Sequence, residues 1–361
     1  MKRSITQDGG GGNGLGRRAF LGAGAALASS SLVRPAFASD EWVAKPPDGF
    51  KPKTYDARVV KAEKTGALSD IMQTNQLWPK PEIARTMLER ALTKLTGKST
   101  IAESLGRFIH KDDVVAVKVN GIAGQNGGTM AVNLELILPV LEGLIELGVP
   151  AEKITVFEQF GTYLIGTRVH IKGRNLPKGV KVGIHGNADA KMKAIPVFEK
   201  VQTRYVRFLT EATAVIDMTQ FKDHGICGFT GCLKNLSHGT IINPEKHHAH
   251  NANPQIAVLY AHPIVTSRVR LHIVDGFKII YDQGPLDKNP KRRILHGAVY
   301  VGTDPVAMDT IGVKVIDDAR RENGLKSLAD SKREAAYLTK AAELKLGEHR
   351  LDNIKLRTVK V

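Results

Sequence analysis

The chain has few cysteines, few aromatic residues and no long apolar run beyond its first forty residues. Two cysteines among 361 residues cannot build a disulfide framework, and they fall short of the four ligands that an iron-sulfur cluster usually takes. We therefore expect no iron-sulfur cluster within this chain. No later segment reaches the roughly 20 apolar residues that span a bilayer, so we expect no transmembrane segment after signal cleavage.

Other absences narrow the range of partners. Lysine and arginine are scattered along the sequence without an aromatic ladder, which argues against nucleic acid as a partner. The glycine-rich loop at 121–128 contains neither G-x-x-x-x-G-K nor G-x-G-x-x-G, so it lacks a standard nucleotide-binding fingerprint. The zinc-protease motif H-E-x-x-H is also missing.

The first forty residues have the order of an export signal. Arg17 and Arg18 stand before Phe20, an apolar stretch of small residues follows, and an A-x-A site ends at Ala38. This order predicts a twin-arginine signal over residues 1–38 and a periplasmic or otherwise exported protein. Signals of this class carry proteins that have already folded, often around a cofactor, so a bound cofactor is favoured.

The chain is strongly basic, with a formal net charge of +16. Residues 1–38 carry five basic residues and one acidic residue, so the remainder still has a charge of +12. A basic balance favours association with negatively charged molecules. We expect a small anionic ligand, with a redox partner protein as a further candidate.

Residues 39–57 are rich in proline, lysine and glycine and predict a linker or surface arm. Beyond them, apolar patterns predict alternating strands and helices. The predicted strands are 114–119, 154–157, 214–218, 271–275, 298–301 and 354–359, and the predicted helices are 83–95, 140–147, 256–265, 305–320 and 333–344. This alternation predicts an α/β fold with a mixed, mainly parallel sheet and helices on both faces. We expect two lobes, 58–200 and 201–361, around a cleft.

The segment 222–251 concentrates the reactive side chains, since it contains both cysteines and five of the twelve histidines. Imidazole, thiol and amine groups bind metals or exchange protons near neutral pH. Histidines also cap helices and line solvated loops, so a structural role is the alternative. Cys227 and Cys232 could form a disulfide, bind a metal or remain free thiols.

Several residues of this segment are candidates for chemistry. The strand 214–218 would deliver His224 to the carboxyl edge of the sheet, where ligands bind in α/β folds. Gly228 and Gly231 permit a tight turn that faces an anion, and Lys234 supplies a charge for it. The cofactor-binding set is Lys118, Asn120, Gly228, Thr230, Gly231, Lys234 and Asn235.

The H-H-x-H run at His247, His248 and His250 predicts ligands for a transition metal such as nickel, zinc or iron, with His238 as a candidate fourth ligand. Glu158 ends a predicted strand and is a candidate base or ligand. The isolated histidines are expected to be structural; they are His110, His170, His185, His262, His272, His296 and His349.

Taken together, these motifs resemble the family catalogued as domain of unknown function 362. The similarity is carried by residues 117–120, Lys222, and residues 224–231, 234–235, 274–275 and 302–309. It implies an α/β fold and leaves the reaction open.

A more remote resemblance links this segment to the lactate racemase family, which holds a nickel pincer nucleotide. The resemblance implies proton transfer by His224, covalent attachment of the cofactor to Lys234 and nickel ligation by His250. Where that family has an earlier histidine, this chain has Glu158.

Two hypotheses follow. The first is an exported protein that binds a metal or metal-containing cofactor in an interlobe cleft and acts on a small anionic substrate by proton or electron transfer. Its catalytic residues would be His224, Lys234 and Glu158. The alternative is a non-catalytic periplasmic binding or accessory protein for an anionic ligand or redox partner.

Overall fold

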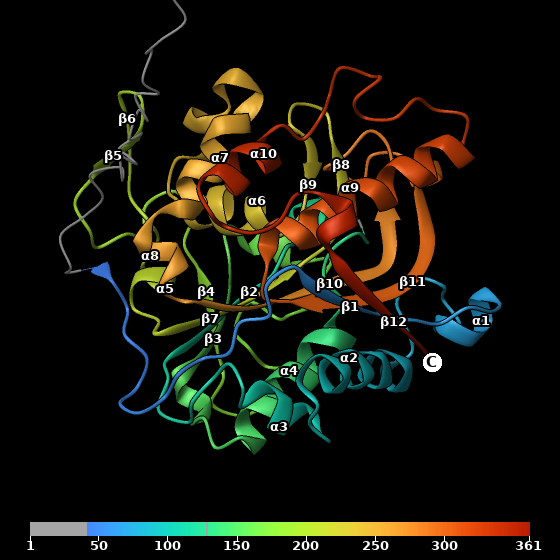
Figure 1. Cartoon of the computed structure of the whole chain (residues 1–361). Coiled ribbons are helices and arrows are strands. Elements are labelled where there is room, and N and C mark those ends of the chain that lie inside the picture. Colours follow the sequence, from blue (N-terminus) through green and yellow to red (C-terminus); the bar gives the residue numbers. More distant parts are fainter. Residues whose placement is uncertain (1–41, 128) are drawn as a thin grey trace, which may run out of the picture. The chain divides into compact units, whose positions relative to one another are not determined.

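The computed structural model describes residues 42–127 and 129–361, which fold around one large β-sheet (Figure 1). The expected export signal at 1–38 lies outside the described residues. Contacts group the described residues as one compact unit. Within the described residues, no helix is long and apolar enough to cross a membrane.

The sheet contains ten strands, eight of them in the order β12-β1-β11-β10-β7-β2-β3-β4, and β8 and β9 extend it beside β10. Their bounds are β1 Arg58–Glu63, β2 Val115–Lys118, β3 Ile154–Glu158, β4 Lys181–Ile184, β7 Ala214–Thr219, β8 Lys222–His224, β9 Gly228–Thr230, β10 Val269–Ile280, β11 Arg293–Gly302 and β12 Lys355–Lys360. Strands β5 (Ile195–Phe198) and β6 (Val201–Thr203) form a separate hairpin.

The central strands β10, β7, β2, β3 and β4 run parallel to one another, and so do β1 and β12. Strand β11 is antiparallel to both β1 and β10. The predicted mixed, mainly parallel α/β fold is therefore confirmed. Two lobes are not shown, because β7 from the second half of the chain pairs with β2 from the first, so one continuous sheet joins both halves.

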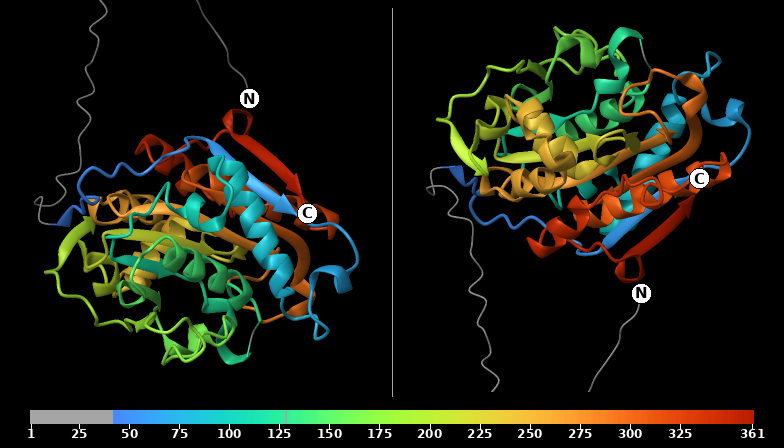
Figure 2. Two further views of the ribbon diagram at one scale, coloured as in Figure 1. Left: turned by 90° about the horizontal axis from the view of Figure 1, so that it is seen from below. Right: turned by 90° about the horizontal axis from the view of Figure 1, so that it is seen from above.

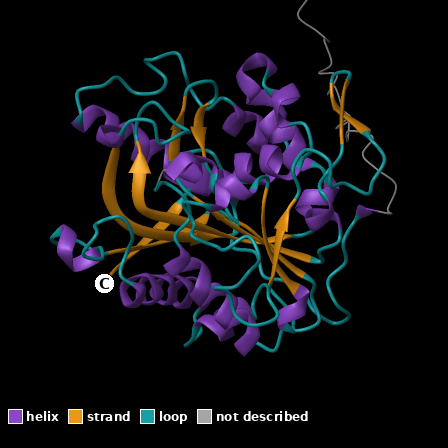
Figure 3. Cartoon of the chain, turned by 180° about the vertical axis from the view of Figure 1, so that it is seen from behind, coloured by secondary structure: helices purple, strands orange, loops and turns teal. Residues whose placement is uncertain are grey.

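Helices cover both faces of the sheet (Figure 3). They are α1 Leu68–Ile71, α2 Pro81–Thr96, α3 Ile101–Leu105, α4 Leu134–Glu146, α5 Arg207–Thr210, α6 Cys232–Ser237, α7 Asn253–Ala261, α8 Pro263–Thr266, α9 Pro305–Glu322 and α10 Tyr337–Glu343. Helices α2, α3 and α4 lie on one side, whereas α6, α7, α9 and α10 lie on the other (Figures 1 and 2).

Successive side chains of β7 point alternately into two hydrophobic cores, one on each face of the sheet. Ile216 and Met218 pack into the core shared with α2 and α4, while Val215 packs into the core shared with α6, α7 and α9. Successive strand residues point to opposite faces. Asp217 therefore points toward the face that α6 covers, and this orientation places it beneath the site described below.

Helix α2 shows why the local prediction succeeded. Its apolar residues recur at helical spacing, and Met87, Leu88 and Leu92 are fully buried. Burial of each side chain of this size stabilises the fold by roughly 1.5–3 kcal/mol. The helix ends at Gly97, whose φ of 72° is the left-handed conformation that glycine adopts without strain.

The second half differs in detail from the predicted elements. The predicted helix 256–265 is broken into α7 and α8, because Pro263 cannot continue the hydrogen bonding of the preceding turn. Strand β10 is much longer than predicted and curves with β11 as an antiparallel pair (Figure 1). Strand β1 was not predicted. It lies between β11 and the C-terminal strand β12 and pairs with both.

Candidate functional site

A cavity of about 460 Å³ lies where β2 and β3 end, at Lys118 and Glu158. This is the carboxyl edge of the parallel strands, the usual position of ligand sites in α/β sheets. The volume falls within the roughly 300–1,000 Å³ typical of small-molecule pockets. Nine residues singled out from the sequence line it, namely Lys118, Asn120, Glu158, His224, Thr230, Lys234, Asn235, His238 and His248.

A short contact between two reactive groups at this cavity joins His224 and Lys234. Nε2 of His224 lies 2.5 Å from Nζ of Lys234, and both residues are buried. His224 ends β8 and Lys234 lies in the first turn of α6, so the β8–β9 hairpin folds the nine intervening residues back on themselves. The sequence prediction that these two residues meet at one cavity agrees with this geometry.

Backbone hydrogen bonds define the proton positions in this pair. The amides of Ile226 and Cys227 both donate to Nδ1 of His224, at 3.1 and 3.3 Å. Nδ1 is therefore an acceptor, and a neutral imidazole then carries its proton on Nε2. That proton points to Lys234, whose nitrogen can accept it only as an uncharged amine.

Burial favours the same uncharged state. It is the main factor that lowers the pKa of Lys234, and burial followed by the adjacent Lys234 lowers the pKa of His224 to about 2. The thiol of Cys227 lies against the same amine, and burial raises its pKa. The imidazole and the amine line the cavity, and the buried thiol contacts the amine.

The opposite wall is a hydrogen-bonded ion pair. Lys118 pairs with Glu158 and also donates to the carbonyl of Val119 at 2.6 Å. The Glu158 carboxylate accepts from the amides of Gly121 and Gln159, at 3.1 and 3.0 Å. Because both carboxylate oxygens are engaged, the geometry favours an anchoring role for Glu158 over the predicted role of base.

Asn235 connects this wall to the interior of the fold. Its Oδ1 accepts from Lys118 and Asn120, both at 3.2 Å, and its Nδ2 donates to Asp217 at 2.6 Å. Asn120 in turn accepts from Lys222, a fully buried lysine whose pKa is lowered to about 7 by burial. Asn120 and Asn235 therefore lie in one continuous polar network.

The histidines of the H-H-x-H run lie in different places. His248 lines the cavity, with its ring stacked 6.3 Å from that of His224. His247 is fully buried, and neither of its ring nitrogens has a hydrogen-bond partner among the described residues. His238 lies between them, with ring centroids 5.0 Å from His248 and 6.4 Å from His247.

His250 does not join this group, which corrects the expectation that it meets His224 and Lys234 at one cavity. Its side chain is 60% exposed, and Nε2 lies 3.0 Å from a carboxylate oxygen of Glu199. The reason lies in the backbone, because His250, Asn251 and Ala252 all have left-handed φ angles between 52° and 59°. These residues turn the chain away from the cavity.

Gly228 and Gly231 pack against neighbouring groups and do not line the cavity, contrary to the expectation that they face an anion. A Cβ atom on Gly228 would lie 1.9 Å from the carbonyl oxygen of Arg333. One on Gly231 would lie 2.2 Å from a carboxylate oxygen of Asp309. Glycine is needed at both positions for this close approach.

Some cavity residues were not singled out from the sequence. They are Ile122, Gln159, Phe160, Tyr163, Asn187, Gly239, Pro244, Glu245 and Pro285. They come from loops between strands and helices, which carry no periodic pattern that would indicate them. For Gln159 and Phe160, the only indication in the sequence was their position directly after the predicted strand 154–157.

A family model for "Domain of unknown function (DUF362)" matches residues 115–314 of this sequence. The chain belongs to this family. The match spans Lys118, Glu158, His224 and Lys234, so the whole polar part of the cavity described above lies within the DUF362 domain.

A search of curated proteins found no match. Among solved structures, the chain is similar to the lactate racemase apoprotein from Thermoanaerobacterium thermosaccharolyticum, with a TM-score of 0.36 and 10% sequence identity. The similarity covers 72% of this chain and 58% of that chain, which is less than two thirds of its length.

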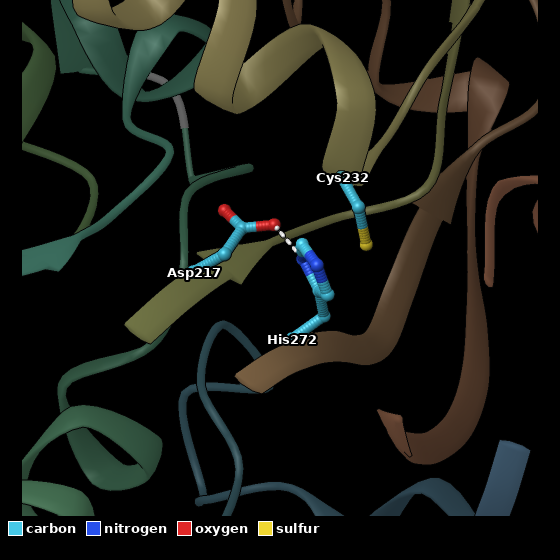
Figure 4. Close-up of side chains that lie close together, drawn as sticks. All are labelled: Asp217, Cys232 and His272. Atoms are coloured by element: carbon cyan, nitrogen blue, oxygen red, sulfur yellow. Dashed lines mark hydrogen bonds and ion pairs between the residues drawn. The ribbon is translucent and has the colours of Figure 1, made fainter. Parts of the chain in front are cut away.

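The DUF362 domain also contains a buried group of metal-ligand type that the sequence did not indicate. Asp217, Cys232 and His272 each offer one ligand atom, and these atoms lie within 4.8 Å of one another (Figure 4). These residues could hold a metal ion. His272 was expected to be structural as an isolated histidine, but the register of β10 on β7 places it directly beside Asp217.

Both cysteines are buried and free, so the disulfide alternative is not realised. Cys227 lies beside Lys234, whereas Cys232 begins α6 and points toward Asp217 and His272 (Figure 4). Burial, followed by the nearby Asp309 carboxylate, raises the pKa of Cys232 well above its ordinary value.

Proposed function

We propose that this protein is an enzyme that binds a small carboxylate in the cavity and transfers a proton to or from it through Lys234 and His224. The observation that carries the proposal is the contact of 2.5 Å between the imidazole and the amine at the cavity wall. An uncharged amine has one lone pair, and Lys234 takes a substrate proton by turning this lone pair from Nε2 toward the cavity.

The imidazole sets the state of the amine. Two backbone amides hold Nδ1 of His224 as an acceptor, so the ring presents a proton to Lys234. When the amine releases the hydrogen bond from Nε2 and takes a proton from substrate, it becomes a cation beside the bound anion. The attraction between this cation and the anion increases as the proton is transferred, so it is stronger in the transition state than in the bound substrate, as catalysis requires.

The other residues of the cavity wall suit an anionic ligand once Lys234 is protonated. Lys118, Asn120 and Asn235 line the wall opposite the pair, and Lys118 is held in place by Glu158. The hydroxyl of Thr230 lines the cavity and has no hydrogen-bond partner among the described residues, which leaves it for a ligand. The net charge of +16 favours encounter with anions.

A metal or metal-containing cofactor beside the pair stays part of the proposal. The residues at hand are His248 in the cavity wall and His247, whose ring nitrogens have no partner among the described residues. The nickel ligand implied by the racemase resemblance, His250, lies outside the cavity and contacts Glu199. The residues present therefore do not fit a nickel pincer nucleotide held as that resemblance implies, and no step of the proposal uses one.

Calorimetric titration with oxalate, pyruvate and lactate tests anion binding. Wild-type protein should bind at least one of them, and Lys118→Met should weaken that binding because it removes the fixed cation of the wall. Lys314→Met is the matched control, since this lysine is exposed and pairs with Asp318 on α9. If none of the three anions binds, or if both variants bind equally well, the anionic-ligand proposal is wrong.

The alternative is an exported binding or accessory protein that uses the same cavity without turnover. It predicts anion binding that Lys234→Met and His224→Gln alter, with no chemical change in the ligand. Binding together with catalysed proton exchange would instead establish the enzyme. Export itself is a proposal that follows from residues 1–38, and detection of the processed chain in a periplasmic fraction would test it.

A further inference from the structure

Beneath the cavity, three side chains of metal-ligand type converge from three separate elements. Asp217 comes from β7, His272 from the neighbouring β10, and Cys232 from the first turn of α6 (Figure 4). All three are at most 1% exposed. None of them lines the cavity, so this group is separate from the proposed catalytic pair.

The local charge balance is unusual for a buried site. Asp217 pairs with His272 alone, and no lysine or arginine pairs with Asp217 or Asp309 among the described residues. Asp309 is also fully buried. Buried carboxylates are normally paired with a cation or coordinate a metal.

The surrounding hydrogen bonds orient each of the three donors. Tyr260 contacts Nε2 of His272 at 3.1 Å, which leaves Nδ1 directed at Asp217. Asn235 donates to one oxygen of Asp217 and leaves the other directed at His272. Metal ligands in proteins are typically oriented by such partners on the side away from the ion.

Asp309 fixes the third donor. Its carboxylate accepts from the amides of Cys232 and Leu233, at 2.6 and 3.0 Å, and so holds the first turn of α6 over the sheet. The Cys232 side chain also lies within hydrogen-bonding reach of Asp217 and Asp309. Without a cation, the thiol can donate a hydrogen bond to only one of the two carboxylates. A metal bound by the thiolate would instead balance the negative charge of the whole group.

We propose that Asp217, Cys232 and His272 form a structural site for zinc, or for a metal of similar ligand preference, that fastens α6 to the sheet below the cavity. One sulfur, one nitrogen and one oxygen donor suit zinc or cobalt, whereas magnesium and calcium take oxygen ligands. The metal acts on the cavity indirectly, because Asn235 joins Asp217 to Lys118 and Asn120.

Metal analysis of the purified full chain tests this inference. Protein produced in zinc-supplemented medium without chelators should contain roughly one zinc per chain. Cys232→Ser and His272→Gln should lose most of it. Cys227→Ser is the matched control, because Cys227 is an equally buried free cysteine of the same segment that lies outside the triad, and it should retain the metal.

Cobalt substitution keeps the inference testable if the triad variants do not fold. Cobalt-loaded wild-type protein should show the absorption of a thiolate-to-cobalt charge transfer, and Cys227→Ser should show the same band. Wild-type protein that takes up neither zinc nor cobalt, or a cobalt spectrum without sulfur ligation, would overturn the inference. Anion binding by such metal-free protein would leave the proposed function intact, so the two claims fail separately.

Discussion

The proton between His224 and Lys234 lies on the imidazole, because two backbone amides occupy Nδ1 and leave Nε2 to face the amine at 2.5 Å. The β8–β9 hairpin and the first turn of α6 form this contact together, and both are buried against the sheet. Lys234 therefore faces the imidazole as an uncharged amine. From the sequence alone, it was expected to be a positive charge that anchors an anion or cofactor.

The first prediction concerns the imidazole itself. In nitrogen-15 NMR spectra of histidine-labelled protein near neutral pH, His224 should show a protonated Nε2 and an unprotonated Nδ1. Its resonances are assigned by their loss in His224→Gln. A protonated Nδ1 would mean that the backbone amides do not fix the ring, and Lys234 would then be free to carry a charge.

The second prediction concerns the packing of α6. Gly231→Ala should reduce the free energy of unfolding by about 1–3 kcal/mol, because the new Cβ would lie 2.2 Å from an Asp309 oxygen. Gly225→Ala is the matched control, since its nearest neighbouring atom would be 4.0 Å away. Urea denaturation of both variants measures the difference, and equal losses would contradict the close approach.

The third prediction is a pH dependence of stability that belongs to Lys222. Burial lowers its pKa in the folded protein to about 7 from the ordinary 10.5, so between these values the unfolded chain binds more protons than the folded one. Stability from this group should therefore increase as the pH rises through that window. Glu158, Lys118, Asp287 and Asp275 are the other charged groups that influence it.

Denaturation of Lys222→Met at several pH values checks this dependence. The variant should gain less stability than wild type between about pH 7 and 10, because it has no proton to lose there. Lys246→Met is the control, since Lys246 is exposed, and it should follow the wild-type curve. Parallel curves for wild type and Lys222→Met would show that the buried amine does not titrate in this range.

Local patterns in the sequence were enough to predict the fold class and half of the site. Apolar spacing predicted α2, and a βαβ pattern predicted that β2 and β3 end side by side, which placed Lys118 and Glu158 together. His224 and Lys234 were expected to share one cavity, and both line it. In each case the decisive interactions lie within one element or between elements close together in the chain.

The remainder depended on long-range register and on backbone conformation. Asp217 and His272 meet because β10 pairs in parallel with β7, although 55 residues separate them. Nothing in the spacing of these two residues specifies that register. His250 was misplaced because H-H-x-H was interpreted as one regular turn, whereas its backbone is left-handed and the side chain points to Glu199.

Catalysed exchange of a carbon-bound hydrogen tests the central claim most directly. Lactate, pyruvate and glycolate are incubated with the protein in deuterium oxide, and loss of the proton signal next to the carboxyl or carbonyl group is followed by NMR. We expect wild type and Lys314→Met to catalyse exchange on at least one of them, and Lys234→Met and His224→Gln to be slower by about 100-fold or more. Bound ligand with no exchange, or equal exchange by wild type and folded Lys234→Met, would contradict proton transfer by this pair.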